Sequence, residues 1–187
     1  DYVCPYCYLE LPVLERLRRE HDEALAIRWH AFELHPEPEP MADPACEAAC
    51  AAWARSVEPL ASERGVRLRR PALQPRSRRA QEAAEFARES GHFDAMHRAL
   101  FEAYFERGED IGSLDVLVRV GRRAGVPEKA LRAALKQGRC TARVTAPVTS
   151  ARSGEASLDM ALPNSTTSTP APTTCCSVAR TSSTFTP

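Results

Sequence analysis

The sequence predicts an α/β protein that is mostly helical over the segment given. Residues 24–34, "ALAIRWHAFEL", alternate in polarity as a strand does, and the prolines of "HPEPEP" after them forbid further ladder pairing. Residues 43–138 instead show helical spacing throughout. A lone strand cannot form a sheet, so the α/β arrangement is expected to be incomplete here. A parallel sheet would need a strand before Asp1 and further strands after Gly138.

The first helix is expected from about Pro5 to Glu20. Proline is favoured in a first helical turn because the N–H that it lacks would have no partner there. The apolar residues behind it recur at helical spacing, at Leu9, Val13, Leu14 and Leu17. Pro12 lies inside this helix and should kink it by crowding the carbonyl of Tyr8.

A block of five short helices should follow the strand. Several of the segments end in glycine, the usual C-terminal stop, and Ser77 and Ser113 are placed as N-caps. The expected segments are 43–65, 77–91, 92–108, 113–125 and 127–138.

The composition of the chain changes near position 140. No threonine occurs before Thr141, whereas the residues from there on are rich in Ser, Thr and Pro. Such a tail is typical of a disordered linker or stalk, but we favour a change of reading frame, because GC-rich codons read one base off give these residues. The expected organisation is a partial domain over 1–40, a helical insertion over 41–140 and an aberrant or disordered tail over 141–187.

The charge balance and hydropathy narrow the expected partners. The 25 Lys and Arg residues equal the 25 Asp and Glu residues, so no global field attracts nucleic acid or an anionic membrane. No apolar run approaches the roughly 18 residues of a membrane helix, and no signal-like leader precedes Asp1. A soluble protein of the cytoplasm is therefore expected.

Two cysteines three positions apart, in "CPYC", open the first helix. Unpaired N–H groups and the helix dipole favour an anion at Cys4, and such positions lower a cysteine pKa from about 8.5 to roughly 3.5–7.5. Cys4 is the expected nucleophile. Cys7 lies one turn further on the same face, more buried, and is the expected resolving thiol. Pro5 and Tyr6 between them should tune the redox potential.

A zinc half-site and a pair of core cysteines are the alternatives for this motif. The second half of a zinc site would have to come from Cys46 with Cys50 or from His92 with His97. Cys46 and Cys50 are four apart on an alanine-rich helix and are more simply packing residues, and the two histidines have the wider helical spacing of five. The redox pair is therefore favoured over zinc.

The remaining residues of interest are more simply structural than functional. His30 and His35 are only weak candidates for catalysis. The basic stretch 69–79, "RRPALQPRSRR", is more simply a solvated loop and helix start than an anion-binding site. No function is assigned to Cys140, Cys175 or Cys176. The aromatic group of the third helical segment has helical spacing and is assigned to the core: Phe93, Phe101, Tyr104 and Phe105.

Four ordered stretches make the chain resemble the DsbA-like thioredoxin family, and most closely its FrnE branch of dithiol-disulfide oxidoreductases. They are "DYVCPYCYL", "FELHPEPEP", the stretch from "QPRSRRAQ" to "FERGEDIG" and "VLVRVGRRAGVPEKALRAAL", which together span roughly residues 1–140. The resemblance implies a thioredoxin fold split by an all-α insertion, with Cys4 as nucleophile and Cys7 as resolving cysteine. It implies disulfide-containing proteins or small thiols as partners and no cofactor.

The chain departs from that family in two places. The family has a strand before the motif, and a cis-proline opposite it that helps to bind substrate. Pro127 begins a helix instead, and Pro147 is a weak candidate for the cis-proline. The related glutathione-dependent 2-hydroxychromene-2-carboxylate isomerases usually carry serine at the position of Cys4 and no resolving partner, so the cysteine pair favours the redox branch.

Overall fold

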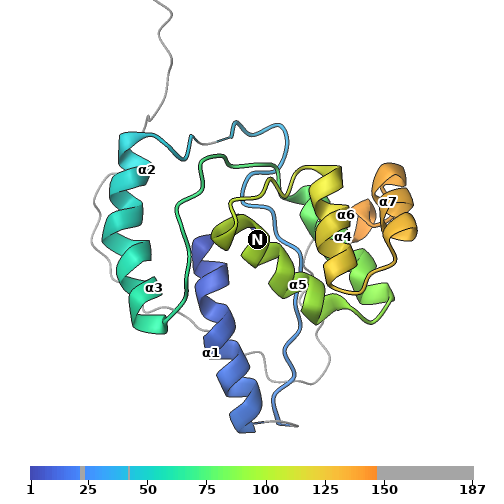
Figure 1. The fold of residues 1–187 in the computed structure, drawn as a ribbon, viewed down its shortest axis with the longest axis horizontal. Coiled ribbons are helices and arrows are strands. Elements are labelled where there is room, and N and C mark those ends of the chain that lie inside the picture. Colours follow the sequence, from blue (N-terminus) through green and yellow to red (C-terminus); the bar gives the residue numbers. More distant parts are fainter. Residues whose placement is uncertain (22–23, 42, 147–187) are drawn as a thin grey trace, which may run out of the picture. The chain divides into compact units, whose positions relative to one another are not determined.

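The computed structural model describes residues 1–21, 24–41 and 43–146, which belong to one compact unit (Figure 1). Its helical elements are α1 (Pro5–His21), α2 (Glu47–Ala52), the π-helical η2 (Trp53–Val57), α3 (Glu58–Arg64), α4 (Arg78–Glu89), α5 (Phe93–Phe101), the π-helical η3 (Glu102–Glu106), α6 (Leu114–Arg123), α7 (Glu128–Gln137) and α8 (Thr141–Thr145). Within these ranges no helix has the length and apolarity to cross a membrane.

The helical segments expected from the sequence form at the expected places. α2, η2 and α3 follow one another without a break and appear in Figure 1 as one rod beside α1. η3 likewise continues α5, and α1 runs through Pro12 to His21. The mostly helical character of the chain is therefore confirmed, whereas the division into domains at position 40 stays a prediction.

The strand predicted over 24–34 does not form. The predicted alternation is present, since Leu25, Ile27, Trp29 and Ala31 are half-buried and the residues between them are exposed. However, no strand occurs among the described residues, so this segment has no ladder partner there. Side chains of α4 bind its carbonyls instead: Arg88 donates to Trp29 O at 3.0 Å and Gln81 donates to Phe32 O at 2.8 Å.

The two predicted serine caps occupy their positions without capping. Ser77 and Ser113 directly precede α4 and α6, but neither side chain bonds to a free N–H of its helix. The Ser77 hydroxyl accepts a hydrogen bond from Gln81 Nε2 at 3.2 Å. Ser77 also has φ of −85° and ψ of −10°, helical values in place of the extended ones of a capping residue, which explains why the predicted cap bond is missing.

The helical packing continues past the change of composition at position 140. α8 packs on α4, with Val144 buried and the Thr141 hydroxyl donating to Glu82 Oε1 at 2.5 Å. The rest of the predicted tail, from residue 147, lies outside the described residues.

The core is built around a helix of small residues and a helix of aromatic residues. α4 contacts α5, α6, α7 and α8, and its alanines Ala80, Ala83, Ala84 and Ala87 are at most 2% exposed. Small side chains let several helices approach α4 closely. The continuous α5 and η3 supply Phe101 and Phe105, which are also buried.

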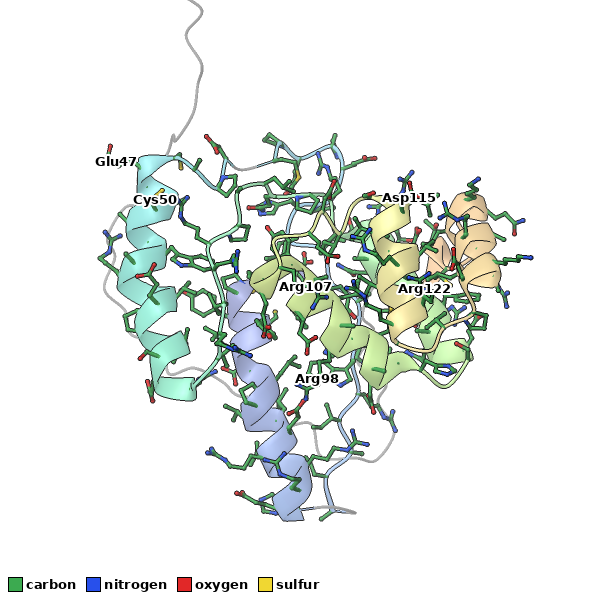
Figure 2. All side chains as sticks on the ribbon, in the orientation of Figure 1. Glu47, Cys50, Arg98, Arg107, Asp115 and Arg122 are labelled. Carbon is green, nitrogen blue, oxygen red and sulfur yellow. The ribbon has the colours of Figure 1, made fainter. Side chains whose placement is uncertain are left out.

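Replacing Gly121 by valine should destabilise the fold by about 1–3 kcal/mol, the usual cost of overpacking. A Cβ at Gly121 would overlap Leu131 Cδ2 and lie 3.6 Å from Val126 Cβ, and Leu131 is fully buried. Arg122→Val, on an exposed neighbour in α6 (Figure 2), is the control and should change stability by only a few tenths of a kcal/mol. Urea unfolding of both variants measures the difference, and equal midpoints would contradict this account of the packing.

Candidate active site

The cysteine motif lies at the start of α1 in a turn that Asp1 holds. Cys4 N donates to Asp1 O at 3.2 Å, and Pro5 is the first residue of the helix, as predicted. The Asp1 carboxylate accepts from Val3 N at 3.3 Å and from Leu34 N at 2.7 Å. Asp1 therefore joins the cysteine turn to the end of the extended segment 24–34.

Both cysteines of the motif are free thiols and both are half-buried, so Cys7 is not the clearly more buried one that the sequence predicts. The main-chain N–H of Cys7 donates to Cys4 Sγ, which is the bond expected at a helix N-terminus. The main-chain nitrogen of Asp1 donates to Cys7 Sγ at 3.4 Å. The two thiols are also hydrogen-bonded to each other.

The hydrogen bond between the thiols separates their acidities. The Cys4 thiol, as the donor, lowers the pKa of Cys7 to about 6, and Asp1 N adds to this effect against the cost of burial. The same hydrogen bond, together with burial, raises the pKa of Cys4. The two thiols therefore titrate as one coupled pair, and the assignment of Cys4 as the nucleophile stays a prediction. In chemical terms, the pair loses its first proton readily and shares the second between its sulfurs.

The residues between the cysteines face outward. Tyr6 is 48% exposed, so its ring is available to a partner approaching the motif, and Pro5 is half-buried. The roles of both in tuning the redox potential stay predictions.

Two tyrosines flanking the motif anchor it to α5 and η3. Tyr8 stacks on Phe101 and Phe105, with centroids 5.4 and 5.6 Å apart, and its hydroxyl donates to Glu106 Oε1 at 2.7 Å. The Tyr2 hydroxyl bonds His97 Nδ1 at 2.9 Å. Helical spacing predicts Phe101 in the core, as observed. No role is predicted for the two tyrosines, although their positions around "CPYC" could have indicated one.

A pocket of about 190 Å³ adjoins the motif. Its lining includes Cys7, residues 29–32 of the extended segment, and side chains of α4 and α5. His30 is on this lining and exposed, which is compatible with the weak catalytic prediction without testing it.

Two buried polar atoms of residues lining this pocket have no hydrogen-bond partner among the described residues, His97 Nε2 and Gln81 Oε1. Each unsatisfied buried group costs about 1–3 kcal/mol. Burial also lowers the pKa of His97 to about 4, so its imidazole is neutral at pH 7. From the sequence, His97 is a candidate only for a zinc site and Gln81 for none, because neither residue has a local signal for a place in a pocket.

The structure gives no support to a zinc site in the described part of the chain, where no three His, Cys, Asp or Glu side chains gather as metal ligands. Cys50, on α2 (Figure 2), donates to Ala45 O at 3.5 Å, and His97 Nδ1 is bonded to Tyr2. Cys140 is buried, which raises its pKa, and so reads as a core residue. Cys175, Cys176 and Pro147 lie outside the described residues.

The basic stretch 69–79 holds neighbouring loops through its arginines. Arg76 donates to His35 O at 2.8 Å and to Glu39 O at 2.6 Å, and Arg78 pairs with Glu33 at 2.5 Å. These contacts fit the structural interpretation of the stretch better than an anion-binding one.

Comparison with known proteins identifies one family and one relative. The family model "DSBA-like thioredoxin domain" matches residues 1–157. "Uncharacterized protein YwbO" of Bacillus subtilis (strain 168) is 29% identical over 139 residues, which cover 73% of this chain and 68% of that protein. The motif with its hydrogen-bonded thiols lies inside both the matched region and the described structure.

Proposed function

Because the chain belongs to the DSBA-like thioredoxin domain family, we propose that it is a thiol-disulfide oxidoreductase acting through Cys4 and Cys7. The observation that carries this proposal is the pair of free thiols, hydrogen-bonded to each other at the start of α1, with one pKa lowered to about 6. A thiolate at neutral pH is what thiol-disulfide exchange needs.

The proposed reaction reduces the substrate in two exchanges. The singly ionised pair shares one proton, and when that proton lies on Cys7 the Cys4 thiolate attacks one sulfur of the substrate disulfide. A Cys4–substrate disulfide forms, and the other substrate sulfur leaves as a thiolate that takes up the proton of Cys7. Cys7 thiolate then attacks Cys4 Sγ, which releases the second substrate thiol and leaves a Cys4–Cys7 disulfide. The two electrons given to the substrate come from the cysteine pair, and a dithiol reductant restores them.

We assign attack to Cys4 because the N–H of Cys7 supports its sulfur at the helix N-terminus, a bond that strengthens when that sulfur is charged. The partners proposed are disulfide-containing proteins or small thiols. A FrnE-like role in repairing disulfides under oxidative stress, in the cytoplasm, completes the proposal. It rests on the resemblance of the motif and of the segments that follow it.

The experiment that tests this function is insulin reduction driven by dithiothreitol. The double variant Cys4→Ser with Cys7→Ser should fall to the rate of dithiothreitol alone, because both exchanging sulfurs are gone. The matched control is Cys46→Ser with Cys50→Ser, which removes two other half-buried thiols and should keep the wild-type rate. Equal rates for the wild type and the Cys4 and Cys7 double variant would end the proposal, and stoichiometric zinc in the purified protein would favour the metal-binding alternative.

A further inference from the structure

We propose that the pocket beside Cys7 binds an uncharged aromatic group that carries a hydroxyl, and that this group is the part of a disulfide substrate next to its reacting sulfur. The binding site is argued from the pocket alone. The substrate assignment rests on the proposed function, because it needs the adjacent cysteine pair to react.

Aromatic rings form the walls of this pocket. Trp29 comes from the extended segment, and Phe93 and Phe101 come from α5. All three rings surround the imidazole of His97, at centroid distances of 4.3, 5.1 and 5.2 Å. Aromatic rings on the lining favour a flat, apolar body in the ligand, because aromatic pairs attract each other beyond their area burial.

The His97 ring supplies a hydrogen-bond donor to the pocket. The Tyr2 hydroxyl and His97 Nδ1 are 2.9 Å apart, and which of the two donates depends on the imidazole tautomer. We assign the donor role to the Tyr2 hydroxyl, which burial keeps protonated, so that the second ring nitrogen, Nε2, bears the hydrogen of the neutral ring. That N–H has no partner in the described structure, although His97 is only 9% exposed. A ligand entering here would therefore satisfy the donor with an acceptor atom.

The Gln81 amide supplies the matching acceptor. Its nitrogen donates to Phe32 O at 2.8 Å and to Ser77 Oγ at 3.2 Å, which fixes the orientation of the amide. Its oxygen, Oε1, is left without a partner, and the side chain is only 3% exposed. A hydroxyl is the small group that offers both an acceptor for His97 and a donor for Gln81.

The charged groups on the lining neutralise each other, which favours an uncharged ligand. Arg88 pairs with Glu85 at 3.2 Å, donates to Trp29 O and lies 3.7 Å above the centre of the Phe93 ring. The Asp1 carboxylate is committed to main-chain N–H groups. A charged ligand would be desolvated here without gaining a partner of its own.

The binding test uses phenol, anisole and toluene as probes on the full chain carrying Cys4→Ser and Cys7→Ser, so that no redox reaction contributes. Titrations followed by NMR through the Trp29 indole signal report occupation of the pocket. Phenol should bind at least about tenfold more tightly than toluene, with anisole between them, because one good hydrogen bond is worth about that factor. Equal affinities, or no binding of any probe, would overturn the proposal and leave a pocket filled by water.

A pair of variants separates the polar contact from general effects on the fold. Gln81→Met removes the acceptor, whereas Arg79→Met changes an exposed residue of the same helix. The ratio of phenol affinity to toluene affinity should fall about tenfold in Gln81→Met and stay unchanged in Arg79→Met. An unchanged ratio in Gln81→Met would overturn the assignment of the acceptor.

The assignment of this group as part of a disulfide substrate is tested with bis(4-hydroxyphenyl) disulfide and bis(4-methylphenyl) disulfide. The thiols that these two disulfides release have similar acidity. The wild type should reduce the hydroxylated one with a kcat/KM about tenfold higher. Equal kcat/KM values with selective phenol binding would overturn the substrate assignment alone. If phenol binds selectively but neither disulfide nor insulin is reduced, the proposed function fails and the binding site stands.

Discussion

Cys7→Ser should accumulate a covalent adduct with its disulfide substrate, whereas Cys4→Ser should accumulate none. In the first variant Cys4 still attacks, but no second sulfur is present to attack Cys4 Sγ, so the reaction stops at the mixed disulfide. Serine at position 7 keeps the main-chain N–H and has a hydroxyl that can donate to the Cys4 sulfur, and both groups would stabilise a thiolate on Cys4 once the second thiol is gone. The yield should approach one adduct per chain.

The measurement is the intact mass of each variant after incubation with oxidised glutathione, with and without a final reduction. A Cys4→Ser, Cys7→Ser double variant controls for adducts on the other cysteines. An adduct on Cys4→Ser alone would reverse the proposed order and assign attack to Cys7. Cys7 lines the pocket and its pKa is lowered, so attack by Cys7 is the chemical alternative. An adduct on Cys4→Ser alone would therefore contradict the role assigned to Cys4, although the cysteine pair would still carry out the reaction.

The helices could be predicted because their signals are local. α7 runs from Glu128 to Gln137, directly between Pro127 and Gly138, as the sequence indicates. Gly138 has φ of 61°, the left-handed conformation that glycine adopts most readily at the end of a helix. Start and stop residues of this kind act within a few positions, so the pattern of one short segment is sufficient.

The predicted strand failed because a strand depends on a partner that its own sequence does not supply. The alternation around Trp29 determines which side chains are half-buried, and that part of the prediction was right. Ladder hydrogen bonds require a second extended chain alongside. Arg88 and Gln81 of α4 bind two of the carbonyls instead, which period-2 patterning cannot indicate.

The cysteine pair, like the helices, depends on local spacing, whereas the pocket, like the strand, depends on contacts between distant residues. Cys4 and Cys7 are three positions apart, so a helix brings them together whatever surrounds them. Tyr2 and His97 are 95 positions apart and meet because α1 and α5 pack through Phe101. The donor of the pocket therefore depends on tertiary packing that no spacing in the sequence reports.

Alkylation of the motif by iodoacetamide should be governed by a pKa near 6 in the folded protein, not near 8.5 as in a free cysteine. Only the thiolate reacts, so the rate should rise about tenfold per pH unit below that pKa and level off above it. At pH 7 the ionised fraction of the folded motif should be roughly 30 times that of the same motif in the unfolded chain, where only about 3% of an ordinary thiol is ionised. The rate at pH 7 should rise by less than this factor, because a thiolate of lower pKa is a weaker nucleophile. Mass spectrometry of the peptide bearing Cys4 and Cys7, over pH 4 to 9, measures both states.

The cause of this shift can be isolated by two substitutions at the donor. Cys4→Ala removes the hydrogen bond that chiefly lowers the pKa of Cys7, so the midpoint of its alkylation should move up towards the ordinary value. Cys4→Ser keeps an O–H that can donate to the same sulfur, and its midpoint should stay closer to that of the wild type. If alanine and serine give the same midpoint as the wild type, the hydrogen bond between the thiols does not set the acidity of the pair.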